Sequence, residues 1–296
     1  MAKSQLDSLV HTRYSQAIAE GALLFTESTV SLQPERDVEF EIRYVPALAK
    51  KPSSKPREKQ MSKGFVNPFL PFDPRLHVKR LGSSHQLLLN KYCVVPHHLL
   101  ITTAEFKQQG EPLDESDFAA VLETTSSLSR PQILFYNSGE ESGASQPHKH
   151  LQVLPMPQYF TAPPSERIWR RSCSYMESST VAISKDLPFA HFGISIDVKN
   201  SSSADLATAY CTTLAHLTAA YGKEASYNMI MTPTALMLFP RRFSSWQGIS
   251  INSLGFAGLV LCKSTEELGI VSNTGVLTIL SNVGYPLSLN SIDNTL

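Results

Sequence analysis

The amino-acid sequence predicts an α+β protein built on a mainly antiparallel sheet with flanking helices. Two observations support this prediction. Strand-like segments cluster along the chain with short polar turns between them, and helix-like segments interrupt them at irregular intervals instead of following every strand. The chain has 296 residues, of which 42% are hydrophobic. That is enough to bury a sizeable core, either in one large domain or in two intimately joined parts.

The first part of the chain predicts a helix, a lysine-rich loop and three strands. Residues 5–25 carry apolar side chains at near-helical spacing, which predicts an amphipathic helix. Residues 38–44 alternate apolar and charged side chains, which predicts a half-exposed strand. Residues 46–64 are rich in lysine and proline and predict a solvated surface loop. Residues 87–103 form an apolar run broken at Pro96, which predicts two strands joined by a tight turn.

The rest of the chain continues this mixture of helices and strands. Residues 114–128 predict a helix with Asp114 or Ser116 as its cap. Residues 204–221 predict a second helix. The other segments are short and apolar and predict strands, namely 132–137, 148–154, and a hairpin of 227–231 with 235–239.

Charge and cysteine usage narrow the class of protein. Lys plus Arg and Asp plus Glu both number 26, so the net charge is zero and no global field would gather nucleic acid or a membrane surface. No apolar stretch is long enough for a membrane span, and the N-terminal residues lack the apolar core of a signal peptide. The four cysteines are far apart and form no C-x-x-C pair, which favours a reducing compartment. We expect a soluble cytoplasmic protein.

The most informative segment is NSGEESGASQPHKHLQ, residues 137–152. Alternate side chains of a strand share a face, so His148, His150 and Gln152 are expected to point one way. Leu151 and Val153 then point to the buried side. The small residues upstream predict a loop whose amides can approach a ligand closely, which is the composition of an anion-binding nest.

An imidazole beside such a nest has the chemistry to attack phosphorus. Its pKa of about 6.5 leaves it mostly neutral at pH 7, with a lone pair on one nitrogen. The other nitrogen must then hold its proton against an acceptor. Gln152, Ser145 and the loop amides can donate hydrogen bonds to the charge that develops on the phosphoryl oxygens. From the residues alone, a histidine pair on a strand also fits a structural role or half of a metal site.

The segment resembles the signature of the histidine-triad superfamily, and more narrowly of the branch with glutamine at the third triad position. That branch contains the galactose-1-phosphate uridylyltransferases and the diadenosine tetraphosphate phosphorylases, also called ATP adenylyltransferases. The phosphorylases fit better, because further segments match them in the same order: 67–72, 88–92, 95–102, 135–139, 143–152 and 248–258.

The resemblance covers roughly residues 35–285 and implies a histidine-triad-like fold. It also implies two parts. The N-terminal part, residues 1–165, carries the histidine motif. The C-terminal part, residues 185–290, contributes to the nucleotide site, and we expect the two parts to form one compact unit.

The resemblance implies the roles of individual residues. His150 is the nucleophile that takes AMP, Gln152 contacts the transferred phosphate, and His148 supports His150. A lysine of the lysine-rich loop touches phosphate, either Lys51, which we choose, or its neighbour Lys50. The other substrate-binding residues that the resemblance implies are Asn90, Lys91, Asn137, Gly143, Ala144, Ser145, Gln146, Asn252, Ser253, Leu254, Leu259 and, on phosphate, Lys263.

His148 has a second interpretation, as a metal ligand. In the uridylyltransferases the corresponding position helps to bind a structural zinc ion together with an upstream histidine and a pair of cysteines. Here His97 or His98 can supply the histidine, but no cysteine pair precedes them, so the four ligands of a structural zinc site are incomplete. We therefore expect no structural metal. A Mg²⁺ ion can still accompany the nucleotide, held mainly by phosphates and water.

The reaction implied by the resemblance is the reversible phosphorolysis of diadenosine tetraphosphate to ADP and ATP through an adenylyl-histidine. The expected partners are small molecules: a dinucleoside polyphosphate, ATP, ADP and inorganic phosphate. Three alternatives stay open, namely a hexose-1-phosphate uridylyltransferase, a dinucleoside polyphosphate hydrolase and a non-catalytic nucleotide-binding sensor. The choice of base and the oligomeric state are not encoded in any pattern of the sequence.

Overall fold

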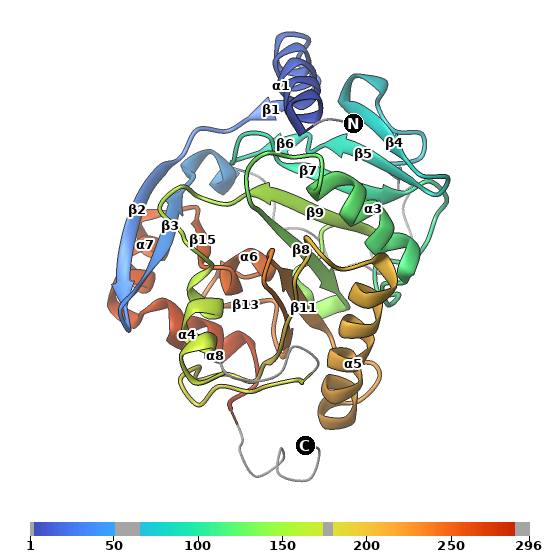
Figure 1. Cartoon of the computed structure of the whole chain (residues 1–296). Coiled ribbons are helices and arrows are strands. Elements are labelled where there is room, and N and C mark those ends of the chain that lie inside the picture. The colour runs from blue at the N-terminus through green and yellow to red at the C-terminus, as the bar shows by residue number, and fades with distance from the viewer. Residues whose placement is uncertain (1–2, 51–65, 174–179, 288–296) are drawn as a thin grey trace.

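The centre of the molecule is one antiparallel sheet, which the computed structural model shows together with the rest of residues 3–50, 66–173 and 180–287 (Figure 1). The sheet has eight strands in the order β10-β12-β11-β8-β9-β7-β5-β4, and all neighbouring strands run antiparallel. The strands are β4 (His77–Leu81), β5 (His85–Leu89), β7 (Leu99–Thr103), β8 (Gln132–Ser138), β9 (His150–Pro155), β10 (Phe192–Ser195), β11 (Tyr227–Met231) and β12 (Ala235–Pro240).

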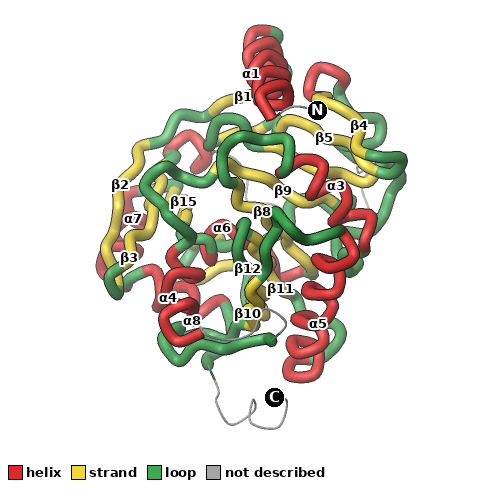
Figure 2. The backbone as a smooth tube through the Cα atoms, viewed as in Figure 1, coloured by secondary structure: helices red, strands yellow, loops and turns green. Residues whose placement is uncertain are grey.

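Three helices share a hydrophobic core with one face of this sheet: α1 (Lys3–Ala19), α3 (Glu115–Thr125) and α5 (Ser203–Tyr221). Figure 2 shows α3 and α5 following one another along the same side of the strands. Helices α3 and α5 both begin at a capping box, in which the side chain of Asp114 or Ser202 accepts an amide hydrogen bond from the third helical residue. None of the described helices is long and apolar enough to cross a membrane.

A second core lies on the opposite face of the sheet. Strand β8 shows the division, because Leu134 and Tyr136 belong to the first core whereas Ile133 and Phe135 belong to the second. A three-stranded sheet, β15-β3-β2, and four helices also contribute to the second side. These elements are β2 (Thr29–Glu35), β3 (Val38–Tyr44), β15 (Leu259–Cys262), α4 (Pro164–Cys173), α6 (Ser253–Phe256), α7 (Thr265–Thr274) and α8 (Val276–Val283).

Short elements connect these layers. Strands β1 and β6 form a parallel pair, and β13 and β14 form an antiparallel one. Three 3-10 turns complete the described chain. The bounds of these elements are β1 (Leu24–Phe25), β6 (Tyr92–Cys93), β13 (Ser245–Trp246), β14 (Ile249–Ser250), η1 (Pro46–Lys50), η2 (Pro74–Leu76) and η3 (Glu140–Ser142).

The predicted α+β class with a mainly antiparallel sheet is confirmed, but several predicted boundaries are wrong. The helix expected over residues 114–128 ends at Thr125. The helix expected over residues 5–25 ends at Ala19, because Leu24 leaves it to pair with Tyr92. The strand expected over residues 148–154 begins at His150. His148 instead forms an isolated bridge with Gln108.

The large sheet is continuous across the two predicted parts of the chain. Strand β8 comes from residues 1–165, and it pairs over five residues with β11, which comes from residues 185–290. Unfolding either part would break this ladder of backbone hydrogen bonds. We therefore propose that the two parts fold as one unit.

Gly193 of β10 packs directly under the indole of Trp169, and a larger side chain there should destabilise the protein. A Cβ atom on Gly193 would lie 2.6 Å from Cε2 of Trp169, which is itself buried. We expect Gly193→Ala to lower the free energy of unfolding by about 1–3 kcal/mol, the usual cost of overpacking a core. Urea unfolding measures this change.

Gly269 of α7 provides the matched control, because a Cβ atom added there meets no heavy atom within 4 Å. Gly269→Ala should leave the free energy of unfolding unchanged or raise it by up to about 1 kcal/mol, as alanine favours a helix interior. An unchanged unfolding midpoint for Gly193→Ala would show that the indole can move aside at no cost.

Candidate active site

The His-x-His-x-Gln motif lies at a cavity on the second face of the large sheet. The cavity volume is about 360 Å³. Its floor comes from neighbouring strands whose inward residues are in register: Leu88 of β5 lies beside Leu100 of β7, and Leu100 lies beside Gln152 of β9. Its lining residues include Asn67, Phe69, Phe72, Leu88, Asn90, Lys91, Tyr92, Leu100, Ser145, Gln146, His150 and Gln152.

His150 is held in one tautomer by a main-chain carbonyl. Its ring is 3% exposed, and Nδ1 lies 2.8 Å from the carbonyl oxygen of His148. A carbonyl oxygen only accepts, so Nδ1 carries the proton and donates it. The lone pair of the neutral ring is then on Nε2, as nucleophilic attack requires.

The backbone of His150 is fixed from a second direction by Gln109. The Oε1 atom of Gln109 accepts a hydrogen bond from the His150 amide at 2.8 Å, and its Nε2 atom donates to the His150 carbonyl at 3.2 Å. The same Nε2 atom donates to the carbonyl of Asn137 at 2.9 Å. The buried side-chain amide of Gln109 thus connects His150 to β8, the strand that leads into the loop.

The imidazole of His148 is buried and faces away from this hydrogen bond. Its Nε2 atom lies 3.0 Å from the carbonyl oxygen of Thr103, and its Nδ1 atom lies 2.9 Å from Nδ2 of Asn67. Burial lowers the pKa of His148 below its ordinary value, although hydrogen bonds to the backbone at Thr103 and Glu105 oppose the shift. His148 therefore contacts His150 through its carbonyl, while its side chain anchors the start of the strand.

Gln152 is paired with a histidine that the sequence analysis considered only as a zinc ligand. Oε1 of Gln152 lies 2.9 Å from Nε2 of His98, and Nδ1 of His98 lies 3.0 Å from Nδ2 of Asn90. A signal for His98 exists in the sequence, because it precedes Leu100 by two residues and so shares the face of β7 that lines the cavity.

Residues of the C-terminal part of the chain contact the small-residue loop over residues 139–146 and fix its position. Asn228 of β11 donates through Nδ2 to the carbonyl of Ser142 and to Oδ1 of Asn137, both at 2.8 Å. Gly143 has φ of 76°, and a Cβ atom there would lie 2.8 Å from the carbonyl oxygen of Ile251. Only glycine allows this close approach without strain.

Two residues with implied substrate contacts lie beneath this loop instead of in a cavity. Asn137 is 2% exposed, and its Oδ1 atom accepts hydrogen bonds from the amide and the hydroxyl of Ser253 at 3.0 and 2.7 Å. Ser253 is fully buried. In this structure the two side chains join the end of β8 to the start of α6.

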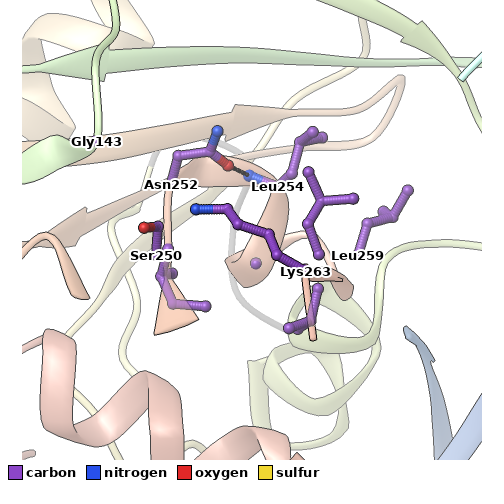
Figure 3. A pocket seen from close by; sticks show the side chains of 10 residues that line it. Gly143, Ser250, Asn252, Leu254, Leu259 and Lys263 are labelled. Carbon is purple, nitrogen blue, oxygen red and sulfur yellow. Dashed lines mark hydrogen bonds between the residues drawn. The ribbon is translucent and has the colours of Figure 1, made fainter. Parts of the chain in front are cut away.

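Figure 3 shows a second, smaller cavity, with a volume of about 130 Å³. Gly143 borders it, so one loop separates it from the larger cavity that holds Ser145. Lys263 points into it toward Asn252, whose Oδ1 atom caps α6 by accepting from the amide of Leu254 at 2.9 Å. The implied residues that line this cavity are Gly143, Asn252, Leu254, Leu259 and Lys263.

The remaining implied contacts lie at or between the two cavities. Asn90, Lys91, Ser145 and Gln146 line the larger cavity. Ala144 belongs to the loop between the two cavities, and its amide donates to Oγ of Ser142. The prediction for Lys51 falls outside the described residues, and its alternative, Lys50, is the last residue of η1.

The sequence left open a metal site formed by His148 together with His97 or His98. In the described ranges, no three residues among the histidines, cysteines, aspartates and glutamates lie in a group that could hold a metal ion. The absence of a structural metal remains a prediction, since the lysine-rich segment is outside those ranges.

Lys149, the residue directly before β9, forms a buried ion pair with Asp117. Nζ of Lys149 lies 2.6 Å from Oδ2 of Asp117 and 2.8 Å from the carbonyl oxygen of Pro112. The other oxygen of Asp117 lies 2.9 Å from Nε2 of His85. Burial alone would raise the pKa of Asp117, but the hydrogen bond from His85 and the charge of Lys149 outweigh it and lower the pKa below its usual value.

Comparison with known proteins identifies relatives along the whole chain. Residues 1–167 match the Ap4A phosphorylase N-terminal domain, and residues 185–286 match the ATP adenylyltransferase C-terminal domain. The Saccharomyces cerevisiae protein APA1 is 27% identical over 310 residues, which cover 96% of this chain and 95% of the relative. The diadenosine 5',5'''-P1,P4-tetraphosphate phosphorylase 2 of the same organism is 28% identical over 299 residues, which cover 90% of each.

Solved structures of a yeast relative share the fold. Yeast Ap4A phosphorylase Apa2 in complex with AMP has a TM-score of 0.82 and 27% identity, and the match covers 98% of each chain. The same protein in complex with Ap4A has a TM-score of 0.81 and 26% identity, with 96% of this chain and 98% of that chain covered. The resemblance to the phosphorylases that was drawn from the sequence is thereby confirmed.

Lys149→Met should destabilise the fold strongly at neutral pH, because it leaves the carboxylate of Asp117 buried without its cation. We expect a loss of about 3–5 kcal/mol in the free energy of unfolding at pH 7. The folded pKa of Asp117 is lowered, so the pair stabilises the protein at pH 4 and above and loses this effect as pH falls through the folded pKa. Unfolding curves at pH 7 and pH 3 should therefore show the gap to the wild type narrowing in acid.

Lys107→Met is the matched control, since its ion pair with Asp114 at 3.2 Å is exposed. It should cost less than about 1 kcal/mol. Equal losses for the two lysine variants would mean that the buried pair contributes no more than a surface pair.

Proposed function

The chain belongs to the Ap4A phosphorylase family, and we propose that it transfers AMP from diadenosine tetraphosphate to inorganic phosphate through an adenylyl group on His150. The products are ADP and ATP. The observation on which this proposal rests is the hydrogen bond from Nδ1 of His150 to the carbonyl of His148 at 2.8 Å, which puts the lone pair on Nε2 of a ring that lines the larger cavity.

The first displacement makes the P–N bond. Nε2 of His150 attacks the α-phosphorus of one adenosine half, and the bond from that phosphorus to the bridging oxygen breaks, so that ATP leaves with the bonding electrons. The adenylated ring keeps its Nδ1 proton and becomes a cation. The carbonyl of His148 accepts the hydrogen bond from that proton and so stabilises the charge.

The second displacement restores the enzyme. An oxygen of inorganic phosphate attacks the adenylyl phosphorus, a new P–O bond gives ADP, and the P–N electrons return to Nε2 of His150. Because the cationic ring is a good leaving group, no external acid is needed at this step. The same two steps in reverse make the dinucleotide from ATP and ADP.

Each of the two cavities suits a different part of the substrate. The larger cavity has aromatic walls at Phe69 and Phe72, which suit the base of the adenylyl half. The smaller cavity holds Lys263, whose charge suits the leaving polyphosphate. The loop with Gly143 and Ser145 lies between them, where its amides can donate to the transferred phosphate.

We also place the enzyme in the cytoplasm. The four cysteines are all unpaired, and three of them, Cys93, Cys173 and Cys262, are buried. Buried free thiols fit a reducing compartment.

Omitting phosphate should trap the proposed intermediate. With radiolabelled diadenosine tetraphosphate, the wild type should retain AMP on a bond that survives base and breaks in mild acid, as expected for a P–N bond. Adding phosphate should discharge the label as ADP. His150→Asn should abolish labelling and turnover, because it has no nucleophilic ring nitrogen.

Variants of two other histidines and the identity of the released nucleotides complete this test. His148→Asn should slow the reaction and leave labelling detectable, and His216→Asn, on α5 across the sheet, should behave as wild type. Release of AMP and ATP would indicate a hydrolase, and binding without turnover would indicate a sensor. Label that persists in His150→Asn would falsify the assignment of the nucleophile.

Lys263→Met should weaken the binding of diadenosine tetraphosphate more than that of AMP, because AMP lacks the distal phosphates that the smaller cavity would take. We expect a loss of roughly tenfold or more in affinity for the tetraphosphate, the value of one charged hydrogen bond. Calorimetric titration of His150→Asn and of its combination with Lys263→Met avoids turnover during the measurement.

Lys199→Met, at an exposed position after β10, serves as the control and should leave both affinities unchanged. If Lys263→Met weakens AMP and the tetraphosphate equally, the lysine does not act on the distal phosphates.

A further inference from the structure

A buried histidine, His98, is hydrogen-bonded to the side-chain amide of Gln152. His98 lies directly before β7 and is 6% exposed. Its Nε2 atom lies 2.9 Å from Oε1 of Gln152, and its Nδ1 atom lies 3.0 Å from Nδ2 of Asn90. The three side chains form a chain of hydrogen bonds that ends at the third residue of the histidine motif.

Asn90 determines which atoms donate and which accept in this series of hydrogen bonds. Its Oδ1 atom accepts a hydrogen bond from the amide of Tyr92 at 3.1 Å, so its NH₂ group faces His98. An NH₂ group only donates, and Nδ1 of His98 must therefore accept. The backbone holds the same pair together, because the amide of Asn90 donates to the carbonyl of His98 at 2.9 Å.

The hydrogen bond from Asn90 also determines which atom of His98 donates to Gln152. Burial lowers the pKa of His98 to about 4, with the hydrogen bond to Gln152 opposing the shift, so the ring is neutral at pH 7. A neutral imidazole that accepts at Nδ1 carries its proton on Nε2. That proton is donated to Oε1 of Gln152, and the NH₂ group is then the end of the amide that is left to face the cavity.

We propose that Asn90 and His98 are positioning residues that fix the Gln152 amide with its NH₂ group toward the transferred phosphate. This rests on the proposed function, in which Gln152 donates to the phosphoryl oxygens. An amide turned by half a rotation has almost the same shape but presents an oxygen, which repels those oxygens. The hydrogen-bond chain removes that alternative before substrate binds.

The proposal changes the role expected for Asn90. The resemblance to the phosphorylases implied a substrate contact, whereas both ends of its side-chain amide are engaged here, by Tyr92 and by His98. Its effect on the reaction then passes through His98 and Gln152. A direct substrate contact would act independently of Gln152, and this difference can be measured.

A double-mutant cycle tests the inference. Gln152→Ala should lower kcat by roughly a hundredfold, the typical cost of one lost donor to a developing oxyanion. His98→Leu should approach the same loss, and Asn90→Leu should lower kcat by about threefold to tenfold, the worth of a single neutral hydrogen bond. In the Gln152→Ala background neither change should lower kcat further by more than about twofold.

His97→Asn is the matched control. It removes the neighbouring imidazole from the same turn, and asparagine tolerates the φ of 59° at that position. The residue lies outside the larger cavity, so kcat should stay within about twofold of wild type.

A second measurement is independent of activity. Nitrogen-15 NMR of labelled histidine at pH 7 should show His98 with its proton on Nε2 in the wild type and as a mixture of tautomers in Asn90→Leu. This spectrum keeps the inference testable if His98→Leu does not fold. A proton on Nδ1 of His98 in the wild type would overturn it, and so would losses that multiply fully in the double variants.

The two proposals fail in different ways. If the wild type takes no AMP label and makes no ADP, the proposed function is wrong. If the wild type does both and the cycle shows independent losses, only the roles of Asn90 and His98 are wrong.

Discussion

The hydrogen bond between Nδ1 of His150 and the carbonyl of His148 is the constraint on which the site depends. This bond constrains the local backbone, because the ring of His150 must reach the carbonyl oxygen of the residue two positions earlier in the chain. The chain achieves this where it enters β9: His150 pairs with Thr102 in the ladder, while His148 is still outside the strand and bonded to Thr103. The strand therefore begins at His150, and the carbonyl that accepts the hydrogen bond from its Nδ1 atom lies just before the strand.

Contacts on both sides of the sheet hold this part of the chain in place. On the cavity side, Gln152 is tied to His98. On the reverse side, Lys149 is bonded to Asp117, and Leu151 and Val153 are fully buried. A shift of register by one residue would turn Lys149 to the opposite face and leave the carboxylate of Asp117 buried without its cation, so the ion pair disfavours such a shift. Lys149, between the two histidines, thus anchors the chain beside His150 from the reverse side of the sheet.

Local periodicity in the sequence predicted part of the site, whereas the features that depend on distant contacts were missed. His150 and Gln152 on one face, with Leu151 on the other, result from the two-residue repeat of a strand. Asn137 could not be placed beneath the loop, because its partner Ser253 is 116 residues away. Strand β2 was also missed, although Val30 and Leu32 alternate there with polar residues. It lies at the edge of the three-stranded sheet and is exposed over most of its length, so its pattern does not mark a buried face.

A buried cation, Arg241, connects several segments of the C-terminal part beside the site. Arg241 is 2% exposed, and its guanidinium donates to neutral oxygens, those of Asn228, Phe243 and Ile251. Burial lowers its pKa to about 9, which still leaves it charged at pH 7. Asn228 continues the network to the loop at Ser142, and Ile251 lines the smaller cavity. Arg241 thus connects the loop at Ser142, through Asn228, with the backbone of Ile251 at the smaller cavity.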